Sequence, residues 1–471
     1  MTWKGKRDRP MKGFGRRDFI KVASAAPCVA AAGCGWTGRT VPPWIETDVL
    51  VVGGGPAGTC AAVSAARMGA KTVLAERFGC LGGNLTLGHV SPVLGKVCPG
   101  TMADEVRKLL DANHAEARKV MTRNGPEEHI DHEEAKWILA KLCEDAGVTV
   151  LLCAPAVDAV MDGKRIQGVV VDTPKGLRTI RARVVVDATG DGRVAMEAGA
   201  ECKIGRDSDG ATQPSTLEFV VDGVDESCGI TAWGGTDPVK LPSGEEYRML
   251  CKRMNAAGEL PKNVTIVRLH RTFYPGERSV NATQVNGVDA LDPAAIGKAD
   301  VELRRQIDMC VAFLRKHVPG YANCRVKSTA DTLGVRETRR VMGDAMVVDG
   351  DLLEGRKYDD AVVHDAWFLI DIHNPKGGGQ AVGHSHPAKP YDIRYGTFLP
   401  KGIDGLLTAG RCISGTHRAH ASYRVMTPCM AMGEAVGVAA ALSAKRGIVP
   451  RALPAAEIRR VLSERGVRLE S

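Results

Sequence analysis

Three glycines near the start of the chain have the spacing of a phosphate-binding turn. Gly53, Gly55 and Gly58 follow an apolar run, 49–52, and precede a stretch of small residues, 59–68. In such a turn the first glycine permits a tight bend, the second lets backbone approach a pyrophosphate, and the third lets helix and strand pack closely. The start of the helix also offers unpaired N–H groups to phosphate oxygens. The pattern predicts a dinucleotide-binding unit.

An acidic residue occupies the position at which such units bind a ribose. A second apolar run, 72–75, ends on Glu76, and this acid lies about 20 residues after the glycine turn. A carboxylate at this point can accept hydrogen bonds from ribose hydroxyls. A glycine turn alone would be a weak signal, but here the strand, turn, helix, second strand and acid occur in the required order.

Two later segments are typical of contact with the same ligand. Gly83 and Asn84 belong to a glycine-rich loop after the second strand, whose backbone can run close to a ligand. Another apolar strand, 184–187, ends in the small residues 188–192, where Asp191 can reach a sugar hydroxyl. A plain turn is the alternative for that strand end, but the upstream motif favours contact with the cofactor.

Ionisable residues beyond residue 330 are candidates for acid–base chemistry and substrate binding. His417, His420 and Arg424 lie within eight residues of one another, a density that points to a functional site. Arg336 belongs to an arginine-rich segment, 334–340, that could bind an anionic substrate group bidentately. A salt-bridged helix face is the alternative interpretation of that segment.

The spacing of histidines and cysteines argues against a metal. His384 and His386 would share one face of a strand, but two histidines are too few for a closed metal site. We therefore predict no metal and interpret His386 as an acid, a base or a hydrogen-bond donor at the cofactor. The 14 cysteines include no C-x-x-C pair and no zinc or iron–sulfur spacing.

The hydrophobic pattern predicts the elements that position these residues. Helices are expected over 102–117, 132–146, 293–317 and 430–445. Strands are expected over 148–153, 156–161, 167–172, 177–183, 184–187 and 406–409. Turn residues between the middle members of this series indicate a β-meander that leads into a buried strand.

These elements predict an α/β fold that is interrupted by a second domain. The parallel α/β rhythm covers 47–200, is lost over 201–391, and returns over 392–446. We therefore expect a Rossmann-like cofactor domain in two parts, an inserted α+β substrate domain between them, and a C-terminal tail, 447–471. Scarce aromatic residues, 4% of the chain, do not favour a stacking platform for nucleic acid.

Residues 1–40 have the anatomy of an export signal. They contain nine Lys and Arg residues and two Asp residues, so seven of the chain's eight net positive charges belong to this segment. Arg16 and Arg17 stand in a segment, 15–21, that resembles the twin-arginine consensus, with Gly15 in place of the usual Ser or Thr. A short apolar stretch, 22–33, follows.

The end of this leader leaves two cleavage routes open. Ala31–Cys34 resembles a lipoprotein cleavage box, and an ordinary signal-peptidase cut after small residues is an equal alternative. A disordered basic tail is the remaining interpretation of the leader. We expect an exported protein that is periplasmic or held on the cell envelope by a lipid anchor at Cys34.

Taken together, the motifs resemble FAD-dependent oxidoreductases with a glutathione-reductase-like fold. They look closest to a bacterial branch grouped with proteins like the A-type subunit of heterodisulfide reductase. The motifs cover most of Asp48–Lys445. They are V-V-G-G-G-P-A-G, E-R-F-G-C-L-G-G-N, V-V-D-A-T-G-D-G, G-V-R-E-T-R-R, I-D-I-H-N-P-K-G-G-G and A-G-R-C-I-S-G-T-H-R-A-H-A-S-Y-R-V-M-T-P-C-M-A-M-G. The iron–sulfur motifs of heterodisulfide reductase do not occur in this sequence, which argues against a cluster and against disulfide chemistry.

The resemblance implies that FAD is the cofactor and assigns the residues that would contact it. Val157 would meet the adenine through its backbone, whereas the pair Gly410–Arg411 and the pair Met426–Thr427 would lie near the ribityl chain and the isoalloxazine ring. The complete set is Gly53, Gly55, Pro56, Ala57, Gly58, Glu76, Arg77, Gly83, Asn84, Val157, Ala188, Gly190, Asp191, Gly410, Arg411, Met426 and Thr427.

The expected function is an exported FAD-dependent oxidoreductase. A small-molecule substrate would exchange a hydride with flavin N5, while His386, His417 or His420 moves a proton and Arg336 or Arg424 holds the polar part of the substrate. A redox partner protein or a quinone would take or supply the electrons. The alternatives are an electron-transfer or sensor flavoprotein without its own substrate, and a heterodisulfide-reductase-like electron-transfer subunit.

Overall fold

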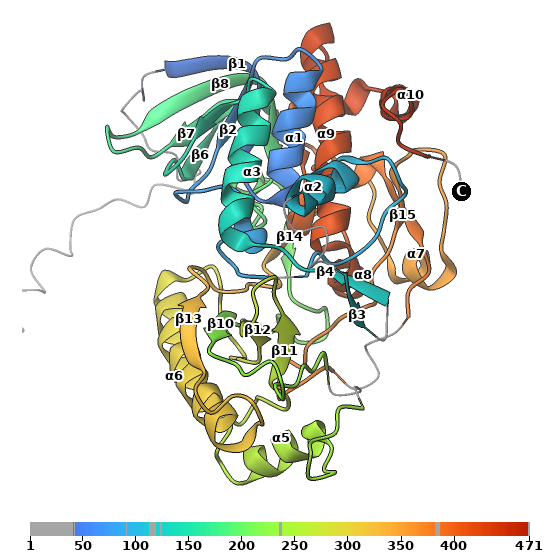
Figure 1. Ribbon diagram of the computed structural model, residues 1–471. Coiled ribbons are helices and arrows are strands. Elements are labelled where there is room, and N and C mark those ends of the chain that lie inside the picture. The colour runs from blue at the N-terminus through green and yellow to red at the C-terminus, as the bar shows by residue number, and fades with distance from the viewer. Residues whose placement is uncertain are drawn as a thin grey trace, which may run out of the picture. The chain divides into compact units, whose positions relative to one another are not determined.

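The largest sheet of the protein is organised around the strand that precedes the glycine turn (Figure 1). The computed structural model describes residues 41, 43–90, 92–112, 119–122, 125–234, 238–381 and 387–469, and only the backbone of 119–122 and 125–128. Four parallel strands pair in the order β5, β2, β1, β8. Their bounds are Thr149–Leu151, Thr72–Ala75, Pro43–Val52 and Arg178–Asp187.

The apolar run that ends β1 is buried on both faces. Val49 and Val51 contribute to one hydrophobic core, whereas Leu50 and Val52 contribute to a second core on the opposite face. Because successive side chains of a strand point to opposite faces, a strand covered on both sides needs apolar residues at every position. This explains why the run is continuous instead of alternating.

A single long strand, β8, replaces the two consecutive strands expected over 177–183 and 184–187. Its first half pairs antiparallel with β7 (Arg165–Val171), which pairs with β6 (Ala156–Asp162), and this confirms the predicted meander. Its second half pairs parallel with β17 (Leu406–Thr408). The division was wrong because one continuous strand can change partners along its length without a turn.

Two helices far apart in the sequence pack side by side over this sheet (Figure 1). They are α1 (Pro56–Arg67) and α9 (Met426–Arg446). A Cβ atom on Gly433 would lie 2.0 Å from the Ala57 carbonyl oxygen, and one on Gly437 would lie 2.3 Å from the Ala61 carbonyl oxygen. These glycines therefore let the two helix backbones approach within a distance that no side chain would permit.

Most predicted helices are confirmed, with corrected ends. The helices α3 (His132–Asp145) and α6 (Pro293–His317) agree with the prediction to within one residue at each end. The helix α2 covers Met102–Asp111, and the rest of the segment expected to reach residue 117 lies outside the described residues apart from Ala112. The helix α9 begins four residues before the expected position.

The expected helices also lack one that lies just before α9. It is α8 (His417–Tyr423), which begins after Thr416, whose hydroxyl accepts a hydrogen bond from the Ala419 N–H at 3.1 Å. Threonine is a favourable N-cap residue, so the sequence did contain a signal for this helix.

Between the two parts of the α/β fold the chain forms a second sheet with its own core. Its four antiparallel strands pair in the order β11, β12, β10, β13. They cover Arg268–Arg271, Arg278–Asn281, Phe219–Asp222 and Arg325–Thr329. The helices α5 (Tyr247–Ala256) and α6 bury their apolar faces in the same core.

A short two-stranded ladder marks where the chain leaves the large sheet and returns to it. The strands are β9 (Cys202–Ile204) and β14 (Arg339–Val341), which pair antiparallel. After β14 the chain contributes α7 (Asp349–Glu354), β15 (Ala361–Ala366) and β16 (Tyr391–Arg394). Their buried residues belong to the core around α1 and α9, although this segment lies within the expected insertion, 201–391.

The helix α9 is apolar enough to resemble a membrane span. Among the described residues it is the one helix whose length and hydropathy would suffice, and the apolar window is completely buried in the fold. Within it, Glu434 is 4% exposed and accepts a hydrogen bond from the Met102 N–H at 2.8 Å. Burial raises the pKa of Glu434 from its ordinary value of 4.5 to about 7.

The close approach of α1 and α9 predicts opposite effects for two glycine substitutions. Gly437→Ala places a methyl group against the Ala61 carbonyl and should lower the free energy of unfolding by at least about 2 kcal/mol. Gly297→Ala in α6, where a Cβ meets nothing within 4 Å, should raise it by roughly 0.5–1 kcal/mol. Urea unfolding measures both values. Equal effects of the two substitutions would contradict the packing argument.

The buried carboxyl of Glu434 predicts a pH-dependent stability. Because its pKa is higher in the folded protein, the folded state binds the proton more tightly, and stability falls as pH rises from 4.5 to about 7. Glu434→Gln keeps an acceptor for the Met102 N–H. It should abolish the fall in the free energy of unfolding over this pH range, which amounts to up to about 3 kcal/mol. Urea unfolding of both proteins at several pH values checks this. Parallel stability curves would refute it.

Candidate cofactor and substrate sites

The glycine turn after β1 has the geometry that its spacing predicts. Gly53 has a φ of 101°, a conformation that L-residues rarely adopt. A Cβ on Gly58 would lie 1.7 Å from the Gly53 carbonyl oxygen, so this glycine is required for packing. A Cβ on Gly55 would meet nothing within 4 Å. The middle glycine therefore faces open space, as expected where a ligand approaches the backbone.

The first turn of α1 is prepared for an anion. Its N-cap is Gly55, no side chain caps it, Pro56 occupies the first helical position, and the first turn contains no acidic residue. The N–H groups at such an end carry a partial positive charge and need acceptors. Because an open space adjoins Gly55, the turn fits a pyrophosphate.

The carboxylate of Glu76 is held at the end of β2. It accepts hydrogen bonds from the Gly54 N–H at 2.5 Å and from the Phe78 N–H at 2.9 Å. Glu76 also lines a cavity of about 280 Å³ together with Gly53, Arg77, Pro155 and other residues. The predicted ribose-binding acid thus stands at a cavity wall beside the glycine turn.

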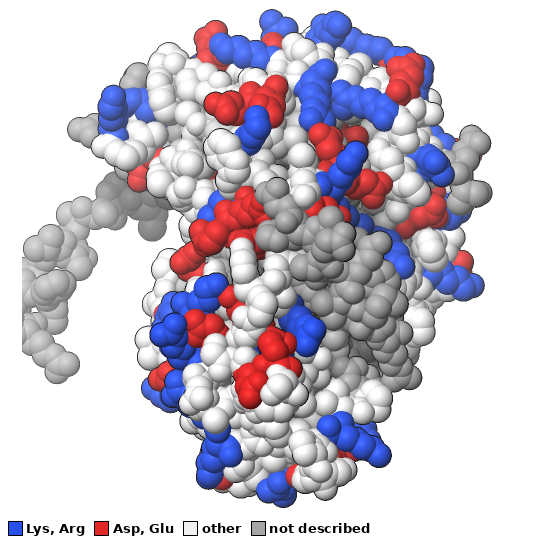
Figure 2. All heavy atoms as spheres, in the orientation of Figure 1, with Lys and Arg blue, Asp and Glu red and all other residues white. Residues whose placement is uncertain are grey.

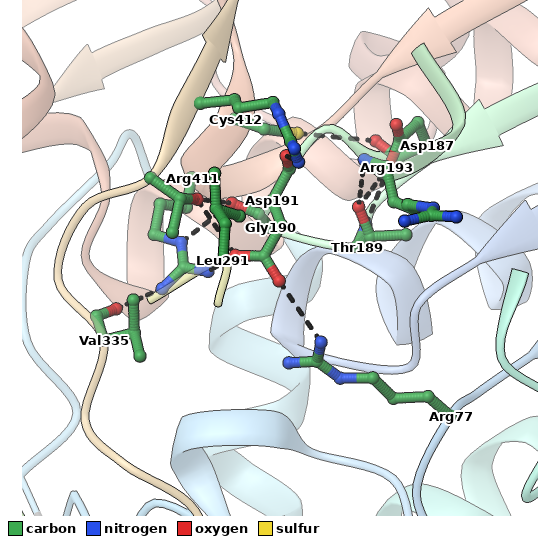
Figure 3. A network of polar contacts seen from close by, with 12 residues as sticks. Arg77, Asp187, Thr189, Gly190, Asp191, Arg193, Leu291, Val335, Arg411 and Cys412 are labelled. Carbon is green, nitrogen blue, oxygen red and sulfur yellow. Dashed lines mark hydrogen bonds and ion pairs between the residues drawn. The ribbon is translucent and has the colours of Figure 1, made fainter. Parts of the chain in front are cut away.

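Asp191, which also lines this cavity, is the centre of a polar network (Figure 3). Its carboxylate accepts hydrogen bonds from the Arg411 guanidinium at 2.5 Å and the Thr338 hydroxyl at 2.9 Å, and it pairs with Arg77 at 3.3 Å. Arg411 also donates to the Gly190 carbonyl at 2.8 Å. Residues predicted from three separate motifs are therefore joined by direct contacts.

The other predicted cofactor residues surround the same turn. A Cβ on Gly83 would lie 3.3 Å from the Gly55 Cα atom, and one on Gly410 would lie 3.0 Å from the Ala57 Cβ atom. A Cβ on Gly53 would lie 2.5 Å from the Ala188 carbonyl oxygen. Asn84 lies in the short 3₁₀ helix η1 (Gly83–Leu85), whereas Met426 and Thr427 begin α9. Val157 is outside the cavity lining, and its carbonyl accepts a hydrogen bond from Arg193 at 3.0 Å.

The inserted segment closes part of the cofactor cavity, which the sequence did not indicate. Leu291, Pro293 and Ile296, at or just before the start of α6, line the same cavity as Gly53 and Glu76. Figure 3 shows Leu291 beside Asp191 and Gly190. Arg193 and Arg339 also line the cavity. Apolar residues of this kind carry no motif, so sequence reasoning could not find them.

A second polar cluster lies where the arginine-rich segment meets α8. Glu337 forms a buried ion pair with Arg340, and their side chains are 0% and 2% exposed. Arg340 also donates to the carbonyls of Gly415 at 3.0 Å and Gly205 at 2.7 Å. The His417 Nδ1 lies 2.9 Å from the same Glu337 carboxylate. Because a carboxylate accepts, Nδ1 carries the proton and Nε2 is left as an acceptor.

The two histidines of α8 differ sharply in their surroundings. The side chain of His417 is 12% exposed, and no other described residue bonds to its Nε2 atom. His420 is completely buried, and neither of its ring nitrogens has a partner among the described residues. Burial, reinforced by the charge of Arg424, lowers the pKa of His420 well below its ordinary value. His420 therefore stays neutral and offers no accessible nitrogen in this structure.

The predicted arginines Arg336 and Arg424 lie in a third cluster with Asp371 and His373. Arg424 pairs with Asp371 at 3.2 Å, and the His373 Nε2 atom lies 3.3 Å from the same carboxylate. Burial lowers the pKa of His373 to about 4, so its imidazole is neutral at pH 7. Asp371 and His373 belong to a motif that the sequence singled out, but the sequence did not reveal their contact with Arg424.

The last predicted site residue, His386, lies outside the described residues together with His384. Among the described residues, no group of three or more His, Cys, Asp or Glu side chains could hold a metal ion. The role of His386 at the cofactor thus stays a prediction.

The sheet and the glycine turn define a mixed α/β, Rossmann-like FAD-binding fold. A family model described as FAD dependent oxidoreductase matches residues 48–462. The chain belongs to this family, and the predictions of an FAD-dependent oxidoreductase and of FAD as its cofactor are confirmed.

Individual relatives match parts of the chain. Digeranylgeranylglycerophospholipid reductase of Picrophilus torridus is 30% identical over 157 residues, which are 31% of this chain and 40% of that protein. Thiamine thiazole synthase of Aeropyrum pernix is 31% identical over 174 residues, 33% of this chain and 59% of that protein. The matches thus span about half the length of these curated relatives.

A solved structure matches most of the chain at low identity. It is a geranylgeranyl bacteriochlorophyll reductase-like protein from Thermoplasma acidophilum, which is 14% identical. The match covers 90% of this chain and 85% of that chain, with a TM-score of 0.46.

The open space at Gly55 predicts that this glycine serves the cofactor and not the fold. Gly55→Ala should leave the circular dichroism spectrum and the free energy of unfolding of the apoprotein unchanged, because its Cβ meets no protein atom. It should lower FAD affinity at least about tenfold, a loss of about 1.4 kcal/mol, because the methyl group enters the space of the pyrophosphate.

The matched control is Gly79→Ala, which also meets nothing within 4 Å but lies outside the turn. Equilibrium titration with FAD, followed by flavin fluorescence, compares the two variants. Unchanged affinity in Gly55→Ala would show that the pyrophosphate is bound elsewhere.

Proposed function

We propose that the protein catalyses hydride exchange between a small-molecule substrate and its FAD. When bound, FAD supplies the hydride donor or acceptor at flavin N5. The observation that carries the proposal is the Glu337–His417 contact, since an oriented imidazole with one accessible nitrogen is what a proton transfer beside a hydride transfer requires. The direction of electron flow stays open.

Residues of three elements would contribute to the proton and hydride transfers. Glu337 holds the proton on His417 Nδ1, so that Nε2 can accept a proton from a substrate and return it. Arg340 fixes Glu337 in place through an ion pair that is almost completely buried. The helix α9 begins at Met426 without a side-chain cap or an acidic residue in its first turn. This end would favour negative charge on a reduced flavin ring.

The finer relationship to glutathione-reductase-like and heterodisulfide-reductase-like proteins is also part of this proposal. It rests on the motifs quoted above, and the parallel strands, the meander and β17 support it. An electron-transfer protein that has no substrate of its own would need no accessible acid–base group. His417 therefore favours the enzyme.

We further propose that the protein is exported. It would work either free in the periplasm or held on the cell envelope by a lipid anchor at Cys34. This proposal rests on residues 1–40, which lie outside the described residues. A redox partner protein or quinone would exchange electrons with it.

Figure 2 shows acidic and basic side chains intermingled over the visible face, which supports the proposal that nucleic acid is not a partner.

Removal of the proposed proton acceptor predicts a specific kinetic defect. His417→Gln and Glu337→Gln should each retain FAD with an unchanged visible spectrum, but slow flavin reduction about 100-fold or more. Anaerobic stopped-flow absorbance measures the rate with whichever small alcohol, amine or hydroxy acid bleaches the wild-type flavin fastest. Reduction at the wild-type rate would refute the role.

The matched control is His317→Gln in α6. His317 also contacts a carboxylate, that of Glu259 at 2.7 Å, but both residues lie in the inserted segment far from the glycine turn in sequence. This variant should reduce its flavin at the wild-type rate. A purified protein that takes up no FAD would overturn the proposed function as a whole.

A further inference from the structure

Arg336 is a partly buried arginine without an acidic partner among the described residues. Its guanidinium donates to the Pro214 carbonyl at 2.8 Å, and it forms no ion pair with any described residue. Desolvation by burial lowers its pKa to about 10, so it is still charged at pH 7. A partly desolvated charge that is not paired is unfavourable. Such a group indicates a site that is completed by an anion.

Arg424 is a second positive charge near Arg336. Only some of its N–H donors have hydrogen-bond acceptors among the described residues. It reaches the Asp371 carboxylate at 3.2 Å and the Asp371 carbonyl at 3.3 Å. Its Nε atom is buried without a partner among the described residues. Asp371 is already shared with His373 and with Gln380, which donates to it at 2.7 Å. The one negative charge of Asp371 therefore cannot neutralise the guanidinium groups of both Arg424 and Arg336.

The other nearby carboxyl, that of Glu218, does not supply the missing charge. Glu218 is 6% exposed and accepts a hydrogen bond from the Asn281 amide at 3.0 Å. Burial raises its pKa to about 8, so most of it is protonated at pH 7. Arg268 faces the same region and has an interaction of its own. Arg336, Arg424 and Asp371 together therefore carry more positive than negative charge.

The cluster keeps a small solvent-exposed surface. The side chains of Arg424, Asp371 and His373 are 13%, 16% and 11% exposed, although protein surrounds them. Arg424 also directly follows α8 and precedes the first residues of α9, where the isoalloxazine ring is expected. An anion held here would lie next to the proposed site of hydride exchange.

We propose that Arg336 and Arg424 bind the carboxylate group of a small organic acid, which is the substrate class of this enzyme. The proposal rests on the proposed function. A carboxylate supplies negative charge to a cluster in which the guanidinium groups outnumber the ionised carboxylates. The planar guanidinium groups also match a carboxylate in geometry.

The first test needs no substitution. Purified holoprotein is titrated with acetate, lactate, succinate and benzoate, and with the neutral amides of the same acids. Binding is followed by calorimetry and by perturbation of the flavin absorbance. At least one acid should bind at least tenfold more tightly than its amide. If no acid binds, or if amides bind equally well, the proposal is overturned.

The second test assigns the site. Arg336→Gln should weaken binding of that acid about 10- to 100-fold, and Arg336→Lys should restore part of it. Arg325→Gln, at an exposed arginine, is the control and should bind like the wild type. Unchanged affinity in Arg336→Gln would overturn the assignment, and the flavin spectrum reports whether each variant is folded.

The two proposals fail in different ways. Acids that bind at Arg336 but never reduce or reoxidise the flavin would support the site and contradict hydride exchange with this substrate class. Rapid flavin reduction by neutral compounds, with no binding of acids, would support the proposed function and overturn the carboxylate site.

Discussion

The contact between α1 and α9 is the constraint on which both ends of the cofactor site depend. Gly433 and Gly437 let α9 lie against the backbone of α1, so the two helices cannot shift along one another without a clash. The uncapped start of α1 faces the proposed pyrophosphate position, and the uncapped start of α9 faces the proposed ring position. One packing contact therefore sets the separation of two helix ends that are more than three hundred residues apart in the chain.

The strand β8 performs a corresponding role within the sheet. Because it pairs with β7 over its first half and with β17 over its second half, it joins the meander to the C-terminal part of the fold. Its end also carries Gly190 and Asp191 into contact with Arg411, which follows β17. The order of strands thus brings two distant motifs together at Asp191, which lines the cavity along with the start of α6.

Buried charge is arranged differently in the two ionisable clusters. Around Glu337 every strong donor has an acceptor. Arg340 bonds one carboxylate and two carbonyls, His417 bonds the same carboxylate oxygen as Arg340, and the Gln213 N–H donates to the other oxygen. Such a satisfied network is rigid. Around Arg336 and Arg424 the donors exceed the acceptors among the described residues. The first arrangement suits a group that must keep its orientation, and the second suits a group that must receive a ligand.

Local chemistry was sufficient for the cofactor unit. The strand, the turn over Gly53–Gly58 and the acid Glu76 could be predicted because the backbone conformation of a glycine and the burial of an apolar strand are properties of neighbouring residues. The long helix Pro293–His317 was predictable for the same reason, since its proline start and its apolar period are local. The sequence also placed Arg336, His417 and Arg424 in motifs that favoured a functional interpretation.

Which charge meets which partner was decided by the tertiary structure alone. Nothing in the sequence distinguishes Arg340, which is neutralised by Glu337, from Arg336, which lies four residues earlier and has no acidic partner in the part of the chain that the structure describes. The difference between the accessible His417 and the buried His420 likewise depends on packing and not on residue type. An ionisable side chain acquires its chemistry from neighbours that long-range folding brings to it, and those neighbours are not adjacent in the chain.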